Sequence, residues 1–395
     1  MPRVNVTGAA ELSALLEERV LAAVVEAGGW LPFDRYMAMA LYEPGLGYYA
    51  RGAAIFGALP SARGGSDFIT APELSPLFGA TLAHQVAEAL RVGGLHEVIE
   101  FGAGSGALAA QLIEALDASM PPGQAGLVGP QRVRYRIVEL AGPLRERQQQ
   151  RLAHFGERVS WLDRWPEEIE AVVVGNEVLD AMPVKLLHFD GEAWWERGVV
   201  AVAVPGEHAA GARPTLGFGD RPTRLRPPRP ERALPGAVLE IHPQAEAFVR
   251  SLAERLVRGA AFFVDYGFPE AEYYHPQRHQ GTLMCHRAHR SDSAPLAEPG
   301  TKDITAHVNF TAIALAAQEA GAEVAGYTSQ ARFLVNCGLL NALEGADVRT
   351  VAAAQKLITE HEMGELFKVL AFARGLDFGA EGPLGFRDGD RTHML

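Results

Sequence analysis

Three glycines stand within five positions directly after a short apolar run, in the stretch VIEFGAGSG at residues 98–106. Glycine adopts positive φ angles at little steric cost and lets a ligand approach the main chain closely. The third glycine comes one residue earlier than in the dinucleotide-binding pattern G-x-G-x-x-G, which disfavours a nicotinamide dehydrogenase. The candidate ligand-binding residues here are Glu100, Gly102, Ala103, Gly104 and Gly106. The alternative is a glycine-rich turn that binds nothing.

Two further acidic residues follow apolar runs that read as strands. Glu139 lies in YRIVEL, with Leu140 after it, and Asp163 ends VSWLD. A carboxylate after the second strand of a doubly wound sheet can accept hydrogen bonds from both hydroxyls of a ribose, and ligands of such sheets bind at the carboxyl ends of the strands. We therefore interpret Glu139, Leu140 and Asp163 as ligand-binding residues. The alternative for each acid is a solvent-exposed loop residue.

The stretch GNEVLDAMP offers a pair of carboxylates after a fourth apolar run. Glu177 and Asp180 are three residues apart, so on a helical turn both side chains share one side. Such a pair can orient a cation, above all the planar fork of a guanidinium group. We single out Asn176, Glu177 and Asp180 as candidate catalytic residues. The alternative for Asp180 is that it caps the turn that follows.

Histidines and a cysteine gather in HPQRH and CHRAH, at positions 275, 279, 285, 286 and 289. Histidine and cysteine ligate zinc at defined spacings. The spacings here match no zinc motif, so we expect loop histidines and no metal site.

Short apolar runs alternate with helix-like stretches from residue 98 onward, which is the pattern of a parallel sheet buried on both faces. The expected strands span residues 98–101, 134–138, 159–162, 171–175, 261–265, 323–328 and 366–373. Helices are expected over 11–27, 31–44, 76–91 and 310–320, and after residues 106, 143 and 242. The sequence thus predicts an α/β fold with a doubly wound sheet.

Three regions depart from this alternation. Residues 183–189 and 193–202 are expected to pair as a hairpin around Asp190-Gly191, followed by an inserted, partly extended loop over 205–235. Residues 266–305 are expected to be irregular and 376–395 a loose tail. The expected organisation is an N-terminal helical segment over 1–92, a core domain over 93–375 with an insertion at about 183–237, and the tail.

Composition limits the function classes. The formal net charge of -12 argues against general nucleic-acid binding, because an acidic surface repels a phosphate backbone. Two cysteines cannot form a disulfide framework, so a reducing cytoplasm is the expected compartment. The N-terminus has no apolar signal-peptide region, and no run of about 18 apolar residues occurs, so no membrane span is expected. The sequence predicts no particular oligomeric state.

Longer motifs resemble the MidA family of S-adenosylmethionine-dependent methyltransferases, which includes a mitochondrial complex I assembly factor. The matching segments run in the family's order from about residue 31 to 373 and are FDRYMAMALYEPGLGYYA, GSDFITAPELSPLFG, VIEFGAGSGALA, GNEVLDAMPV, PGTKDITAHVNFTA, QARFLVNCGL and MGELFKVLA. The glycine loop reads GAGSG where members often have GPGRG or GPGNG. The resemblance implies S-adenosylmethionine as cofactor and a class I methyltransferase fold, Rossmann-like and mostly parallel with an antiparallel last strand.

The resemblance also implies that the segment GSDFITAPE folds over the cofactor. Its polar candidates for cofactor contact are Asp67, Thr70 and Glu73. The alternative is structural: Thr70 begins a helix, and Glu73 lies favourably at the positive end of that helix.

The resemblance suggests a protein arginine as methyl acceptor, in a subunit of a respiratory complex. A guanidinium group is charged at all ordinary pH values, so carboxylates must orient it. On this basis Glu177 and Asp180 hold the acceptor, and Asn176 orients the cofactor or the acceptor. The alternatives are a small-molecule methyltransferase on the same sheet and an assembly factor that binds a partner and retains the cofactor for stability. The carboxylate pair argues against the assembly factor, because a pure binder needs no such pair at the methyl position.

Overall fold

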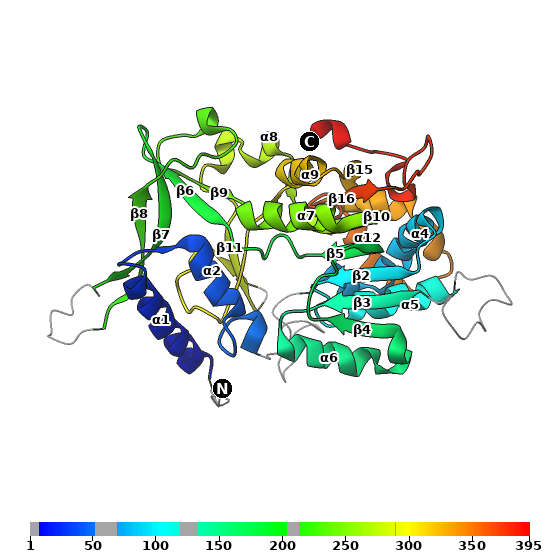
Figure 1. Cartoon of the computed structure of the whole chain (residues 1–395), viewed down its shortest axis with the longest axis horizontal. Helices are drawn as coiled ribbons and strands as arrows, with labels where there is room; N and C mark the ends of the chain where they lie inside the picture. The colour runs from blue at the N-terminus through cyan, green and yellow to red at the C-terminus, as the bar shows by residue number, and fades with distance from the viewer. Residues whose placement is uncertain (1–7, 52–68, 119–132, 204–212, 289) are drawn as a thin grey trace. The chain divides into compact units, whose positions relative to one another are not determined.

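The computed structural model describes residues 8–51, 69–118, 133–203, 213–288 and 290–395, and the chain divides into two compact units (Figure 1). Unit 1 comprises Met1–Ile55, Asp180–Ala245 and Glu270–His307, and unit 2 comprises Phe56–Leu179, Glu246–Pro269 and Val308–Leu395. Each unit is therefore assembled from three separate stretches of chain. The insertion that we expected within the core domain belongs to the same unit as the N-terminal helices.

Unit 2 contains an eight-stranded sheet in its described part, in the order β15-β16-β10-β5-β2-β3-β4, with β14 beside β10. Its strands are β2 (Glu97–Phe101), β3 (Arg134–Val138), β4 (Val159–Leu162), β5 (Ile169–Asn176), β10 (Leu256–Phe268), β14 (Val308–Asn309), β15 (Glu323–Ser329) and β16 (Phe367–Arg374). Strands β4, β3, β2, β5 and β10 are parallel, and β16 is antiparallel to both β10 and β15. This confirms the doubly wound, mostly parallel sheet with an antiparallel last strand.

Helices separate most of these strands along the chain (Figure 1). They are α3 (Ala71–Leu74), α4 (Pro76–Gly93), α5 (Ala107–Ala118), α6 (Gly142–Leu152), most of α7 (Pro243–Arg255), α9 (Phe310–Glu319), α10 (Gln330–Asn336), α11 (Leu339–Ala342) and α12 (Val348–Ile358). All five residues of β2 are buried, as a strand covered on both faces requires. The chain order reverses between β2 and β5, and such a switch point is where open α/β sheets bind ligands.

Unit 1 contains two antiparallel sheets in its described part. The larger has the order β1-β7-β6-β9 with β8 beside β7, and the smaller has the order β12-β11-β13. Its elements are α1 (Ala9–Glu26), β1 (Leu31–Pro32), α2 (Phe33–Tyr42), β6 (Lys185–Phe189), β7 (Trp194–Val202), β8 (Thr215–Pro222), β9 (Ala237–Ile241), α8 (Glu270–Tyr273), β11 (Met284–Arg287), β12 (Arg290–Asp292) and β13 (Asp303–Thr305). The expected hairpin forms, because β6 and β7 pair antiparallel. The stretch expected to be irregular contains β11, β12 and β13.

Strand β8 corrects the expectation of a loop over 205–235. It pairs with β7 in unbroken register from Thr215 to Pro222. The glycines that suggested a loop have a packing reason: a Cβ on Gly217 would lie 2.7 Å from Val202, and one on Gly219 would lie 2.5 Å from Val200. Glycine in a strand often marks such close approaches, so cross-strand packing outweighs its low strand propensity.

The C-terminal segment corrects the expectation of a loose tail. Strand β15 lies at the edge of the sheet, and Tyr327 in it donates its N–H to Asp390 (2.9 Å) and accepts from Arg391 N–H (2.6 Å). Gly385 N–H donates to the Gln85 side chain at 2.7 Å, and Phe386 is only 4% exposed. An edge strand presents unpaired backbone groups, and the C-terminal segment covers part of this one.

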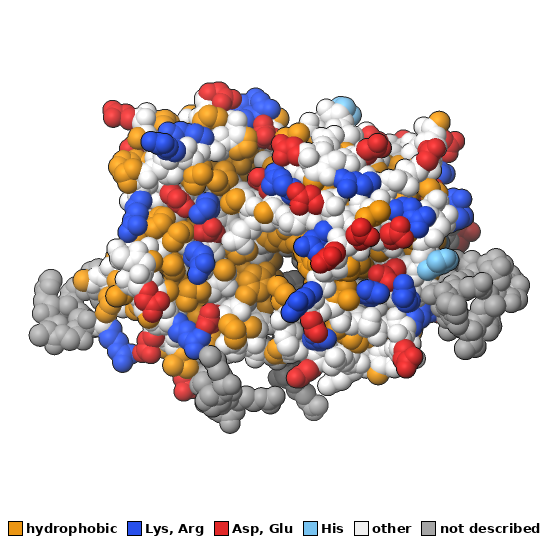
Figure 2. Space-filling view, viewed as in Figure 1, with side chains coloured by type: hydrophobic (Ala, Val, Ile, Leu, Met, Phe, Trp, Pro, Cys, Tyr) orange, Lys and Arg blue, Asp and Glu red, His pale blue; other side chains and the backbone are white. Residues whose placement is uncertain are grey.

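Basic and acidic side chains are interspersed on the face of the molecule in Figure 2. The formal charge of -12 is therefore not gathered into a single acidic field on that face. Among the described residues, no helix combines the length and hydropathy that crossing a membrane requires.

Candidate functional site

The glycine loop follows β2 at the switch point of the unit 2 sheet. Gly102, Gly104 and Gly106 have φ angles of 63°, 52° and 80°, a left-handed region that favours glycine. A Cβ on Gly102 would lie 3.1 Å from Val178, and one on Gly106 would lie 3.4 Å from Leu152. Ala103 is only 7% exposed and packs in the hydrophobic core of the unit. The backbone conformation of this loop therefore depends on its glycines.

Glu139 lies at the end of β3, and its two carboxylate oxygens have different partners. Oε1 accepts the N–H of Ala141 at 2.8 Å, and Oε2 accepts the Nε2–H of Gln148 at 2.9 Å. Burial raises the pKa of this carboxyl, while its hydrogen bonds act in the opposite direction. The backbone of Leu140 also donates to this carboxylate, and a carboxylate has about four lone-pair sites, so about one site is left for a ligand hydroxyl.

Gln148, which the sequence analysis missed, joins this carboxylate to the glycine loop. Its Nε2 also donates to the carbonyl of Gly104 at 3.0 Å, and its Oε1 accepts from Trp161 Nε1 at 2.9 Å. Gln148 is fully buried on α6 between Leu144 and Leu152, at helical spacing. A polar residue in the apolar stripe of a helix was the signal that could have identified it.

Two arginines on α6 form ion pairs with the predicted ligand-binding residues Asp163 and Glu73. Arg145 donates to Asp163 at 2.6 Å and lowers the pKa of that exposed carboxyl. Arg151 donates to Glu73 at 2.9 Å and to Ser105 Oγ in the glycine loop at 2.7 Å. Residues 145, 148 and 151 recur every three positions, so one side of α6 organises Glu73, Gly104, Glu139 and Asp163.

The segment before α4 was predicted either to contact the cofactor or to begin a helix, and the structure shows features of both. Thr70 precedes α3 and is 9% exposed, and its side chain makes no capping hydrogen bond. Glu73 is in the first turn of α3, as the structural alternative requires. Its carboxylate also accepts from Ser105 Oγ, so it reaches the glycine loop. Asp67 lies outside the described residues.

Glu100 and Leu140 occupy opposite environments. Glu100 is 2% exposed and accepts the hydroxyl of Tyr135 at 2.8 Å. Burial raises the pKa of this carboxyl to about 8, and the nearby Glu139 contributes to the rise. Leu140 is 89% exposed, which leaves an apolar side chain beside Glu139 that a planar ligand group could cover.

Glu177 directly follows β5 and has a φ of 54°, a strained value for a residue with a side chain. Its N–H donates to the carbonyl of Val264 at 2.9 Å, and its Oε1 accepts from Asn176 Nδ2 at 2.9 Å. Asp265, 1% exposed, accepts the N–H groups of Val178 at 3.2 Å and Leu179 at 2.9 Å. Such strain persists where the surroundings enforce it, and it is common at functional sites.

Asn176 carries a buried polar atom. Its Oδ1 has no hydrogen-bond partner among the described residues, although its Nδ2 is bonded to Glu177. A buried acceptor without a partner costs about 1–3 kcal/mol. This atom is therefore a candidate contact for a ligand donor at the end of β5.

The expected helical turn from Glu177 to Asp180 does not form. Bends and a turn cover this stretch, and the loop takes its shape from the contacts with Val264 and Asp265. Asp180 is 5% exposed, and its carbonyl accepts the N–H of Ala306 at 3.0 Å. The prediction that a helical turn places the carboxylates of Glu177 and Asp180 on one side is thus wrong.

The histidine-rich stretch is divided in the structure. His275 and His279 flank a short 3-10 turn, His286 lies on β11, and His289 is outside the described residues. No group of three His, Cys, Asp or Glu residues within the described ranges could hold a metal ion.

Comparisons with known proteins cover nearly the whole chain. The family model described as "Putative S-adenosyl-L-methionine-dependent methyltransferase" matches residues 81–328. The Drosophila melanogaster protein named protein arginine methyltransferase NDUFAF7 homolog, mitochondrial, is 27% identical, over 90% of this chain and 84% of the relative. The Danio rerio protein named protein arginine methyltransferase NDUFAF7, mitochondrial, is 25% identical, over 88% and 84%.

A solved structure is more similar still. A Burkholderia thailandensis protein crystallised with bound S-adenosyl-homocysteine is 48% identical, with a TM-score of 0.87 over 99% of this chain and 100% of that chain. The glycine loop, α6 and the stretch from Asn176 to Asp180 all lie within the residues that the family model matches.

Proposed function

The chain belongs to this family of S-adenosylmethionine-dependent methyltransferases, and we propose that it methylates an arginine side chain of a protein. Its cofactor is S-adenosylmethionine. The observation that carries the proposal is the strained Glu177, which the structure fixes after β5 through Val264 and Asp265. The relatives named as protein arginine methyltransferases support the choice of acceptor.

The residues at the ends of β2, β3 and β5 fit this cofactor. The glycine loop presents main chain rather than side chains, which suits the close approach of the methionine portion. We assign the carboxylate of Glu139, oriented by Gln148, to accept a hydrogen bond from the ribose, and Leu140 offers an apolar surface to the base. Oδ1 of Asn176 can accept a donor from the cofactor or the acceptor. The proposed cofactor-binding set is completed by Asp163, Thr70 and Glu73, and by Glu100, which lies on β2 directly before the glycine loop.

The bound cofactor supplies a methyl group on a sulfonium, which is open to in-line attack by a nitrogen atom. This chain must position that nitrogen, because orientation can account for much of the rate enhancement in such a displacement. We assign Glu177 and Asp180 to hold the guanidinium group through charge-assisted hydrogen bonds. The attacking nitrogen loses one proton as it gains the methyl group, and the Glu177 carboxylate is the base that we assign to receive it.

The names of these relatives also support a proposal for the class of acceptor protein. We propose a subunit of a respiratory complex, by analogy with the complex I assembly factor of the MidA family. We place the reaction in the cytoplasm, because both cysteines are free and buried and form no disulfide.

The test adds S-adenosylmethionine with a radiolabelled methyl group to a whole-cell extract and separates protein from small molecules. The protein is then hydrolysed in acid and its amino acids are separated. We expect label in methylarginine, and loss of that label with Glu177→Gln. Label in lysine or histidine would contradict the proposal. Label in a small molecule would indicate a metabolite methyltransferase, and cofactor binding without any transfer would indicate a partner-binding assembly factor.

A further inference from the structure

Unit 1 brings together two buried carboxylates and a pair of tyrosines. Asp180 is 5% exposed and Asp303, on β13, is 4% exposed. The hydroxyl of Tyr49 donates to Asp303 Oδ1 at 3.0 Å. The ring of Tyr49 stacks on that of Tyr42, with centroids 5.6 Å apart and an interplanar angle of 20°. Carboxylates beside aromatic rings are groups that attract a cation.

Backbone contacts hold Asp180 in this group. The N–H of Ala306, directly after β13, donates to the carbonyl of Asp180 at 3.0 Å. The hydroxyl of Tyr42 donates to the carbonyl of the next residue, Ala181, at 2.9 Å. Burial raises the pKa of the Tyr49 hydroxyl, and the charges of Asp303 and Asp180 raise it further. Both carboxylates therefore act on the same tyrosine.

Thr305 supplies an independent observation. It lies two residues after Asp303 on β13, and alternate residues of a strand share a face. Thr305 is 2% exposed, and its Oγ1 has no hydrogen-bond partner among the residues that the structure describes. Native structures rarely bury a hydroxyl without a partner. A ligand that binds beside Asp303 would satisfy it.

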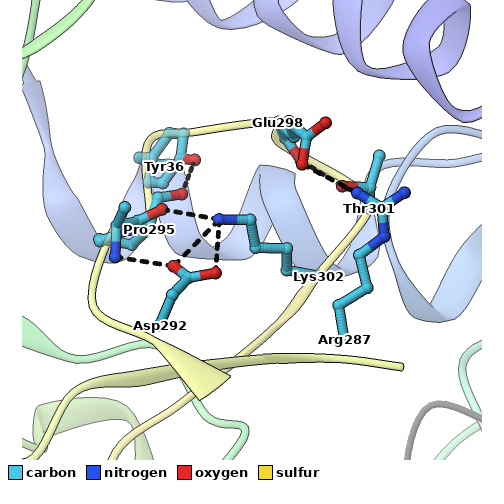
Figure 3. Close-up of polar contacts among 8 residues, drawn as sticks. Tyr36, Arg287, Asp292, Pro295, Glu298, Thr301 and Lys302 are labelled. Carbon is cyan, nitrogen blue, oxygen red and sulfur yellow. Dashed lines mark hydrogen bonds and ion pairs between the residues drawn. The ribbon is translucent and has the colours of Figure 1, made fainter. Parts of the chain in front are cut away.

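A separate set of contacts fixes the segment that leads into β13 (Figure 3). Lys302 Nζ donates to both oxygens of Asp292, at 3.0 and 2.9 Å, and to the carbonyl of Ala294 at 3.2 Å. The hydroxyl of Tyr36 donates to the carbonyl of Pro295 at 2.5 Å. These groups satisfy one another, so we treat them as the support of the loop and as controls.

We infer that Asp303, Thr305 and Tyr49, together with Asp180, bind the guanidinium group of the methyl acceptor. This inference rests on the proposed function and adds three acceptor-binding residues to it. A guanidinium group suits the site better than an ammonium group, because its planar fork can bond two carboxylates and a hydroxyl while lying against an aromatic ring. Asp180 follows Glu177 by three residues, so their Cα atoms are at most about 11 Å apart whatever the arrangement of the units.

Two variants test the inference, Asp303→Asn and Thr305→Val, with Asp292→Asn and Tyr36→Phe as matched controls. The assay is the transfer of labelled methyl to total cell protein at saturating S-adenosylmethionine, with the initial rate measured against acceptor concentration. We expect the acceptor KM to rise about tenfold in each test variant, the loss for a hydrogen bond to a charged group. Cofactor affinity, measured by calorimetry, stays within twofold. The control variants lower the melting temperature but leave the acceptor KM within about twofold.

Thr305→Val keeps the test decisive if Asp303→Asn does not fold. It removes a buried hydroxyl that lacks a partner, so the melting temperature stays the same or rises while the acceptor KM rises. A purely structural Thr305 would leave the KM unchanged. Methylarginine with the wild type and an unchanged KM in both test variants would overturn this inference alone. Absence of methylarginine with the wild type would overturn the proposed function and this inference with it.

Discussion

The proposed cofactor region and the proposed acceptor region differ in how the chain builds them. The cofactor region comes from one run of alternating strands and helices, and one side of α6 holds Glu139, Gly104 and Asp163. The proposed acceptor region joins residues that are distant in the chain, since Tyr49 and Asp303 are 254 positions apart. The alternation of strands and helices along the chain is enough to form the cofactor region. The acceptor region depends on long-range packing and can diverge with the acceptor.

The largest expected effect is that of a substitution at Glu177, which should lower the rate of methyl transfer without weakening cofactor binding. Glu177→Gln removes the charge that is proposed to orient the guanidinium group and receive its proton, so we expect kcat to fall about 100-fold. Cofactor affinity, measured by calorimetry, should change less than twofold. Equal losses of cofactor affinity and rate would show that Glu177 serves the cofactor region instead.

A matched variant at the same position removes the strain as well as the charge. Glu177→Gly should lose activity equally and keep a thermal stability close to that of the wild type. Glycine tolerates the φ of 54° that costs other residues about 1 kcal/mol, and this gain offsets the lost hydrogen bond from Asn176. A drop in the melting temperature of several degrees would mean that the side chain is structural.

The second effect belongs to the cofactor region alone. Gln148→Leu leaves Trp161, Gly104 and Glu139 without their shared partner. We expect an unfolding free energy lower by about 2–4 kcal/mol in urea titrations, and cofactor affinity lower by about tenfold. Gln150→Leu, exposed on the same helix, is the control and should match the wild type. Unchanged cofactor affinity in Gln148→Leu would refute the role of α6.

These two regions also show how far the sequence was informative. The order of strands and helices predicted the sheet and placed Glu100, Glu139 and Asp163 at strand ends, because buried parallel strands are short apolar runs. Gln148 and Asp265 were not assigned as supports, since a side chain that bonds main chain two elements away leaves only a weak local pattern. The roles of Thr305 and Tyr49 could not be predicted from the sequence, because they depend on the packing of β13 against residues from the first fifth of the chain. Glycine and proline predict a loop at strand β8, and a polar, glycine-rich composition predicts a loose tail over 376–395. Cross-strand packing and the covering of an edge strand decide these structures instead.

The smallest expected effect on activity concerns pH and stability. The pKa of Glu100 is about 8 in the folded chain against 4.5 for the free group, so the native state holds an extra proton between these values. The stability from this group is complete below about pH 4.5 and is lost as the pH rises through about 8. Glu100→Gln should flatten this decline, by at most about 5 kcal/mol between pH 5 and 9 in urea unfolding.

The control for this experiment is Glu114→Gln, an exposed position on α5. It should keep the pH dependence of the wild type. Cofactor affinity in Glu100→Gln should fall no more than about tenfold, because the amide still accepts the hydroxyl of Tyr135. An unchanged decline in stability with pH would mean that other groups cause it.

The central claim is that the glycine loop and α6 together bind S-adenosylmethionine, and calorimetric titration of the purified chain tests it most directly. The partner variant is Gly104→Val, because a β-branched residue is strained at a φ of 52°, and the control is Gly142→Ala, which adds a Cβ into open space at the start of α6. The account predicts saturable binding to the wild type and to Gly142→Ala, and none to Gly104→Val at about millimolar cofactor. Equal binding by Gly104→Val, or no binding by the wild type, would contradict it.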